Sequence, residues 1–231
     1  MVRCLARGQV GLRRPTAWPK KLPIVALAMS GAMATCACGS TPHASSLPDS
    51  SIAAESPAGF VSFCIRFADQ CESAGMATIK LTPREWRMIE DVDAQENQDI
   101  KPMDDERHYG RAEYWTIPAD GYGDCEDYAL AKRRDLIKLG FPEGALRLAV
   151  VRTQERAGHA VLTIATDRGD FVLDNLTSAV LSWTDTPYSW IARQSGADPW
   201  KWVSFQPHGL VLTATLPGIS KGLPGGGDSN S

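Results

Sequence analysis

The amino-acid sequence predicts an α+β domain in which helices come first along the chain and pack on an antiparallel β-sheet that follows. Two observations support this fold class. Capping signals and apolar residues at helical spacing occur before residue 140. Short strand-like runs, two of them joined by a tight turn, occur after residue 145. Helices followed by a run of strands are typical of α+β domains.

The first predicted helix covers about residues 83–96. Residues 82–85 (TPRE) form a capping box with proline at the first helical position. Trp86, Ile89 and Val92 recur at helical spacing, so we expect them on the buried side of the helix.

The second predicted helix begins with Asp124 as N-cap and stops at Gly140, a natural helix terminator. Five residues lie along roughly one face of it, and we expect them to be buried: Cys125, Tyr128, Ala129, Leu136 and Leu139.

Three strand-like segments follow the second helix: ALRLAVVR (145–152), HAVLTIAT (159–166) and DFVLDN (170–175). The tight turn at 167–169 (DRG) joins the second and third of them into a hairpin. Residues 202–205 and 210–212 are expected to add two more strands.

The N-terminus has the pattern of a secretory signal peptide. Residues 1–21 carry six basic residues and no acid, and an apolar, uncharged stretch follows over 22–38. We therefore predict a signal peptide over 1–38. An uncleaved membrane anchor and a lipoprotein signal are alternatives, and in each case the mature protein leaves the cytoplasm.

The rest of the chain reads as one domain between two flexible segments. We expect a disordered linker over 39–58, which is rich in Ser, Ala and Pro, a folded domain over 59–216, and a flexible tail over 217–231. The net charge is −3, and the basic residues of the folded part are not clustered. This composition does not indicate nucleic-acid binding.

Export permits disulfide bonds. Cys64 and Cys71 have a spacing that can close a small loop, and we expect them to pair. Cys125 would then be the odd cysteine of the folded domain. A leftover thiol in an exported protein is a candidate reactive group.

Cys125, His159 and Asp174 are candidates for a catalytic triad. Cys125 lies in the first helical turn, where the partial positive charge of the helix lowers a thiol pKa. His159 begins one strand of the hairpin and Asp174 ends the other, so the two fall within about a residue of directly opposite each other. A cysteine hydrolase needs a thiolate, an imidazole beside it and a group that orients the imidazole.

Each of these residues alone also has an ordinary structural interpretation, in a core, at a strand end or at a turn. Their combination in this order favours the catalytic interpretation. The other histidines fit less well, because His43 lies in the linker, His108 in a polar segment, and His208 beside a proline and a glycine near the end of the domain.

The segments GYGDCEDYALAKRRDLIKLGFP (121–142), HAVLTI (159–164) and DFVLDN (170–175) resemble the bacterial transglutaminase-like cysteine proteinases. GFVSFCIRFADQC and AEYWTIP, further upstream, are also similar, so the resemblance covers about residues 59–205. It implies a papain-like, transglutaminase-like core with Cys125 as nucleophile, His159 as base and Asp174 as the orienting carboxylate.

The resemblance also implies a biological setting. The best understood members of this family are periplasmic, calcium-dependent proteases that release large surface adhesins and so control biofilm attachment. A membrane receptor that responds to a cyclic dinucleotide sequesters them. For this chain, the resemblance implies a periplasmic location, a protein substrate such as a large adhesin, and an inner-membrane receptor as a candidate partner.

The acidic residues around the cysteine are candidate calcium ligands. Asp124, Glu126 and Asp127 supply carboxylate oxygens within one helical turn, and Ca²⁺ prefers such ligands. The resemblance implies that Asp124 and Glu126 bind Ca²⁺, while Asp127 could face away from them. A bound ion would offset the acids near the thiolate. The alternative interpretation is simple charge complementarity at a helix N-terminus.

Two other functions stay open at this point. One is amidase or transglutaminase-type acyl transfer on the same core. The other is a non-catalytic, calcium-responsive periplasmic binding module with an inert cysteine. The backbone N–H of Cys125 is a candidate oxyanion donor. Tyr114 and Trp115 either line the cleft or belong to the core.

Overall fold

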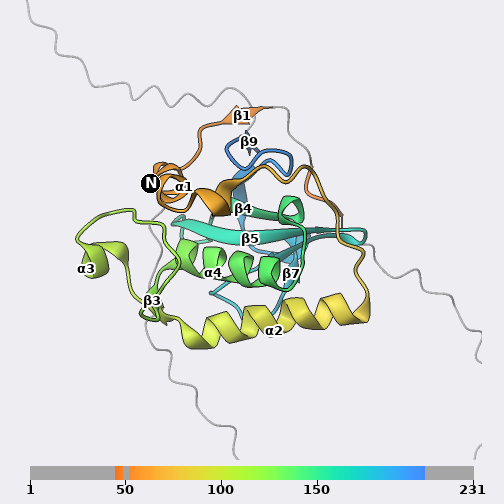
Figure 1. Cartoon of the computed structure of the whole chain (residues 1–231), viewed down its shortest axis with the longest axis horizontal. Coiled ribbons are helices and arrows are strands. Elements are labelled where there is room, and N and C mark those ends of the chain that lie inside the picture. Colours follow the sequence, from red (N-terminus) through yellow and green to blue (C-terminus); the bar gives the residue numbers. More distant parts are fainter. Residues whose placement is uncertain (1–44, 49–51, 206–231) are drawn as a thin grey trace, which may run out of the picture.

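A seven-stranded antiparallel sheet forms the centre of the fold (Figure 1). The structure is a computed structural model that describes residues 45–48 and 52–205. In spatial order the strands are β1 (Ala53–Ala54), β9 (Trp202–Ser204), β8 (Ser189–Gln194), β4 (Leu146–Arg152), β5 (Gly158–Thr166), β6 (Gly169–Leu173) and β7 (Leu181–Ser182).

Four α-helices precede the main strands in the described part of the chain: α1 (Ala58–Arg66), α2 (Pro83–Asp99), α3 (Asp105–Tyr109) and α4 (Cys125–Lys138). Helix α4 packs on β5, and α2 packs on α4 (Figure 1). Short 3₁₀ turns, η1 (Ala68–Cys71), η2 (Glu143–Ala145) and η3 (Trp183–Asp185), and a small parallel pair, β2 (Lys101–Pro102) and β3 (Tyr122–Gly123), complete the fold. The predicted α+β class is confirmed.

Helix α2 begins where the capping box predicts. The Thr82 hydroxyl accepts a hydrogen bond from the backbone N–H of Arg84, and Pro83 is the first helical residue. Ile89 and Val92 are buried, and Trp86 packs edge-on against the sheet. The helix continues to Asp99, three residues beyond the predicted end.

Helix α4 is buried on two sides, because it lies between β5 and α2. Four of the five predicted face residues are buried, but Leu139 is 50% exposed. The prediction for Leu139 is wrong because the helix ends at Lys138 and Leu139 only caps it. Gly140 then adopts φ +91°, a left-handed conformation that favours glycine.

The β5–β6 hairpin has the predicted register, with Leu162 opposite Leu173 and Thr166 opposite Gly169. Strand β8, which lies between β4 and β9, was not expected from the sequence. The expected strand over 210–212 lies outside the described residues, as do the predicted signal peptide over 1–38 and the flexible tail over 217–231.

Part of the predicted linker over 39–58 belongs to the fold. Strand β1 pairs with β9 at one edge of the sheet. Nearer the N-terminus, Leu47 is buried and its backbone N–H donates to the Asp170 carboxylate. Ordered contacts therefore begin before residue 59. No helix within the described ranges combines the length and hydropathy needed to cross a membrane.

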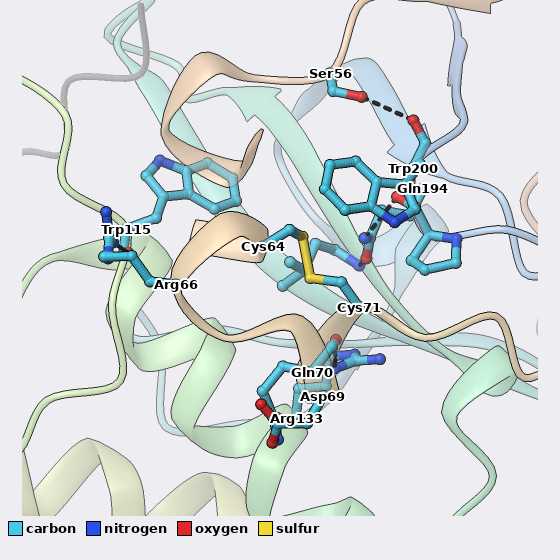
Figure 2. Close-up of a disulfide and its surroundings, with 12 residues drawn as sticks. Ser56, Cys64, Arg66, Asp69, Gln70, Cys71, Trp115, Arg133, Gln194 and Trp200 are labelled. Carbon is cyan, nitrogen blue, oxygen red and sulfur yellow. Dashed lines mark hydrogen bonds between the residues drawn. A yellow bond between two sulfur atoms is a disulfide. The ribbon is translucent and has the colours of Figure 1, made fainter. Parts of the chain in front are cut away.

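Cys64 of α1 and Cys71 of η1 form a disulfide, as the sequence predicts (Figure 2). Both sulfur-bearing side chains are buried in the main core. The adjacent Gln70 carbonyl accepts a hydrogen bond at 2.9 Å from Arg133 of α4. The disulfide thus closes the short segment whose Gln70 carbonyl binds α4.

Replacing Cys64 and Cys71 together with alanine should lower the free energy of unfolding by about 2–3 kcal/mol, since the short closed loop no longer restricts the unfolded chain. Urea denaturation measures this. Ala74→Ser, an exposed change nearby, should leave the midpoint unchanged. An unchanged midpoint in the double variant would contradict a stabilising role for the disulfide.

Candidate active site

Cys125 is the first residue of α4, and only Asp124 separates it from the β3 strand. The entry into the helix is tight. Gly121 adopts φ +78°, and a Cβ on Gly123 would lie only 2.7 Å from the Cβ of Asp127. These two glycines let the chain turn into the helix with the sulfur at its N-terminus, where the helix dipole favours a negative charge.

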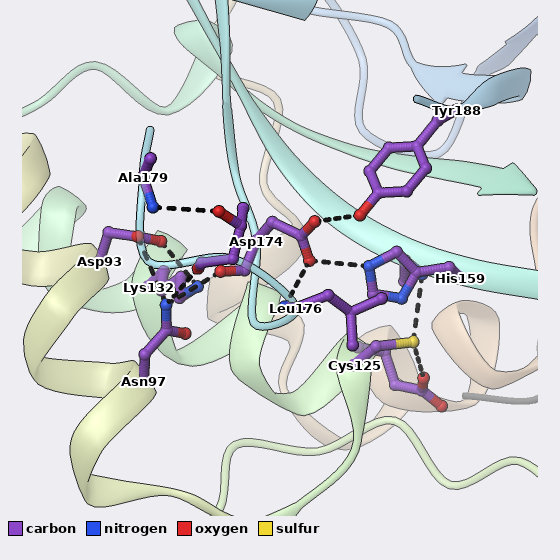
Figure 3. A network of polar contacts seen from close by, with 12 residues as sticks. Asp93, Asn97, Cys125, Lys132, His159, Asp174, Leu176, Ala179 and Tyr188 are labelled. Atoms are coloured by element: carbon purple, nitrogen blue, oxygen red, sulfur yellow. Dashed lines mark hydrogen bonds and ion pairs between the residues drawn. The ribbon is translucent and has the colours of Figure 1, made fainter. Parts of the chain in front are cut away.

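The structure brings Cys125, His159 and Asp174 together (Figure 3). Nε2 of His159 lies 2.8 Å from Oδ1 of Asp174, and both side chains are only 2% exposed. The backbone N–H of Ala160, next to His159 on β5, donates to the Cys125 sulfur at 3.1 Å. Figure 3 shows the imidazole between the carboxylate and the sulfur.

The Asp174 carboxylate is held by several donors. Its Oδ1 accepts from His159 Nε2 and from the Leu176 backbone N–H at 3.0 Å, and its Oδ2 accepts from the Tyr188 hydroxyl. Burial alone would raise the pKa of Asp174, but these hydrogen bonds and the attraction of His159 lower it below its usual value. Asp174 is therefore a carboxylate at neutral pH.

The loop after Asp174 is tied to helix α2. The side-chain amide of Asn97 donates to the Asp174 carbonyl at 2.9 Å and to the Thr177 carbonyl at 3.3 Å. Beside it, Lys132 of α4 forms a fully buried ion pair with Asp93 of α2 at 2.7 Å. These contacts fix the loop relative to the helix that carries Cys125.

The Cys125 sulfur also lies 3.3 Å from Oε2 of Glu126. The sequence predicts that Cys125 is the odd, unpaired cysteine. In the structure, however, Cys125 is disulfide-bonded. The chemistry proposed below belongs to the reduced thiol.

Three carboxylates meet beside the N-terminus of α4. Asp105, Asp124 and Glu126 each place one oxygen within 4.8 Å of the others. Oxygens that share one Ca²⁺ at 2.3–2.6 Å can be up to about 5 Å apart, so this spacing fits a single ion. Asp105, from α3, is not among the ligands that the sequence predicts. Asp127, the third predicted ligand, lies outside the group, and its Oδ1 accepts the Thr116 backbone N–H at 2.8 Å.

This acidic group has unused oxygens and unfavourable charge. Within the described ranges, Oδ1 of Asp105 and Oδ1 of Asp124 are buried without a hydrogen-bond partner, and Asp124 does not cap α4 with its side chain. Burial raises the pKa of Asp124 to about 7, and repulsion from Asp105 adds to the rise. Burial also raises the pKa of Glu126 well above its usual value, as does repulsion from Asp124. A cation would relieve both effects.

Comparison of the sequence with known protein families identifies one that covers most of the chain. The sequence model of the bacterial transglutaminase-like cysteine proteinases (BTLCP) matches residues 50–209, which is more than half of the chain. The chain belongs to this family. The predicted resemblance is confirmed, and with it the assignment to a cysteine peptidase family.

The chain is also similar to solved structures of LapG from Legionella pneumophila. The calcium-bound form is 26% identical with a TM-score of 0.42, and the match covers 49% of this chain and 66% of that chain. The EGTA-treated form is 27% identical with the same TM-score, covering 49% and 64%. The matched region thus spans slightly less than two thirds of the length of LapG. No curated protein matches the chain.

Three other residues considered from the sequence, Tyr114, Trp115 and His108, make contacts of their own. Trp115 is 0% exposed and packs edge-on against Phe60, so it belongs to the core. The guanidinium carbon of Arg66 lies over the Tyr114 ring, 4.1 Å from the centroid of that ring. Nε2 of His108 pairs with Oδ2 of Asp120 at 2.8 Å.

Proposed function

We propose that the chain is an exported cysteine endopeptidase that uses Cys125, His159 and Asp174 to cleave a periplasmic or surface protein. The observation that carries this proposal is the buried His159–Asp174 pair at 2.8 Å beside a cysteine at a helix N-terminus. Membership of a cysteine proteinase family supports it. The buried carboxylate orients the imidazole, and the helix N-terminus favours the thiolate.

The geometry supports acyl transfer through a thioester. The reduced Cys125 thiolate attacks the substrate carbonyl carbon, and the C–N bond breaks as His159 protonates the leaving amine. Water, deprotonated by His159, then attacks the thioester carbon and releases Cys125. Asp174 stays ionised and stabilises the imidazolium. The Cys125 backbone N–H, at the start of α4, is the proposed oxyanion donor.

We further propose that Asp105, Asp124 and Glu126 bind Ca²⁺ beside the nucleophile. Their spacing, burial and unused oxygens fit a hard cation with oxygen ligands. The ion would supply positive charge that offsets these carboxylates near the thiolate. Asp127 has a different role in this proposal, because its bond to Thr116 holds the 113–117 segment against α4.

The proposed setting is the periplasm, where the predicted N-terminal signal would direct the chain. The proposed substrate is a large surface adhesin, and an inner-membrane receptor is the proposed regulatory partner. These proposals rest on the motif resemblance over residues 59–205. A protein substrate such as an adhesin is also consistent with membership of a protease family.

The direct test is to incubate the purified, reduced protein with the N-terminal region of a candidate adhesin, in calcium or in chelator. We expect a discrete cleavage product in calcium only. A labelled primary amine included in the reaction distinguishes the alternative, because its stable attachment to glutamine side chains without cleavage would show transglutaminase chemistry instead. No product with any candidate substrate and no alkylation of Cys125 would overturn the enzymatic proposal.

A further inference from the structure

Tyr188 contacts both the carboxylate and the imidazole of the triad. Its hydroxyl donates to Oδ2 of Asp174, the oxygen that does not face His159. Its ring meets the His159 ring edge-on, with centroids 5.5 Å apart and planes at 63°. Figure 3 shows Tyr188 reaching the carboxylate from the side opposite the Cys125 helix. The Tyr188 side chain therefore contacts two members of the triad at once.

Tyr188 adjoins the same sheet that carries the base. It immediately precedes β8, whose first residue, Ser189, pairs with Arg152 of β4. On the other side of β4, Val151 pairs with His159. Adjacent strands thus set the distance between the Tyr188 hydroxyl and the carboxylate. Loops alone would place it less firmly.

A pocket of about 350 Å³ borders Asp174. Asp174 and Tyr188 both line it, together with Val172, Leu176 and Thr177. Water in this pocket could compete for Oδ2 and let the carboxylate rotate away from the imidazole. The hydrogen bond from the Tyr188 hydroxyl already satisfies Oδ2 at the wall of the pocket. Hydrogen bonds to ionised groups are roughly twice as strong as neutral ones, so this contact can hold the orientation.

We propose that Tyr188 is a positioning residue of the triad: it fixes the Asp174 carboxylate so that Oδ1 stays aligned with His159 Nε2. This inference rests on the proposed protease function. In this role Tyr188 does not act on the substrate. Its effect passes through Asp174, as the effect of an orienting group passes through the base it holds.

The test compares Tyr188→Phe with Tyr128→Phe in the reduced full-length protein. Tyr188→Phe removes one hydroxyl and keeps the ring. Tyr128→Phe is the matched control. Tyr128 lies on the same helix as Cys125 but is not part of the triad, and its buried hydroxyl donates to the Ile100 carbonyl at 2.5 Å. Both changes remove one hydroxyl hydrogen bond, which is partly buried for Tyr188 and buried for Tyr128. Tyr188→Ala is added to open the pocket to water.

Two measurements are made on each variant. Cleavage kinetics should show that Tyr188→Phe lowers kcat on the order of 10-fold with KM unchanged, as expected for a lost hydrogen bond to a charged group. NMR of ¹⁵N-histidine-labelled protein should show the His159 Nε2–H proton shifted upfield and exchanging faster with water. Both effects should be larger in Tyr188→Ala and absent in Tyr128→Phe.

The results separate this inference from the proposed function. A Tyr188→Phe variant with wild-type kcat and a wild-type His159 proton signal overturns the positioning role, and so does a Tyr128→Phe variant that shows the same changes. If the wild-type protein cleaves nothing, the protease proposal fails, while the His159 signal still decides whether Tyr188 positions the pair. If Tyr188→Ala does not fold, Tyr188→Phe decides alone.

Discussion

Cys125→Ala eliminates cleavage of the substrate, with kcat falling on the order of 10⁴-fold or more, while the protein stays folded. Loss of a nucleophile from a triad costs this much because no other group can form the covalent intermediate. The fold survives because alanine fits the space of the buried thiol and α4 keeps its remaining contacts with β5 and α2. Product formation at enzyme excess measures the activity, and circular dichroism measures the fold.

The double variant Cys125→Ala/His159→Gln sharpens this result. Residues of a triad act as a unit, so the double variant should be no less active than Cys125→Ala alone. His108→Gln is the matched control, since His108 also pairs with an aspartate, and it should retain wild-type activity. A Cys125→Ala protein that cleaves at more than a few per cent of the wild-type rate would refute the nucleophile.

Calcium at 100 times its dissociation constant raises the thermal midpoint of the wild-type protein by about 5–10 °C, which corresponds to about 2.7 kcal/mol of added stability. In Asp105→Asn/Asp124→Asn this increase is lost, because two of the three charged ligands are gone. Differential scanning fluorimetry at pH 8, with calcium or chelator, measures both effects without an activity assay.

The same double variant should be more stable than the wild-type protein in chelator. The folded-state pKa of Asp105 and of Asp124 is raised, so ionising them destabilises the fold as pH rises through those values, and neutral amides avoid this cost. Glu90→Gln/Asp91→Asn, which removes two exposed acids from α2, is the control and keeps the calcium response. A calcium-induced increase that survives in Asp105→Asn/Asp124→Asn would rule out this group as the binding site.

Local patterns predict much of the fold. The capping box before Pro83, the glycine after α4 and the turn at 167–169 each act within a few residues, and each appears as predicted. The hairpin register follows from the turn, so the meeting of His159 and Asp174 is predictable before the sheet is known. The Cys64–Cys71 pairing is local for the same reason.

What the sequence does not reveal depends on contacts between distant segments. Asp105 reaches Asp124 only because α3 folds back on the entry to α4. Tyr188 reaches Asp174 only because β8 inserts between β4 and β9, a strand order that no local pattern encodes. Asp127 faces Thr116 instead of its acidic neighbours because the 113–117 segment supplies a backbone N–H there.

The pairing of β1 with β9 joins the beginning and the end of the described domain in one ladder, with Ala53 opposite Val203. Removing β1 would therefore expose the edge of β9, and removing β9 would leave β1 without its partner and expose the edge of β8. Strands β1 and β9 lie side by side at one edge of the sheet, while the hairpin that carries His159 belongs to strands further across it.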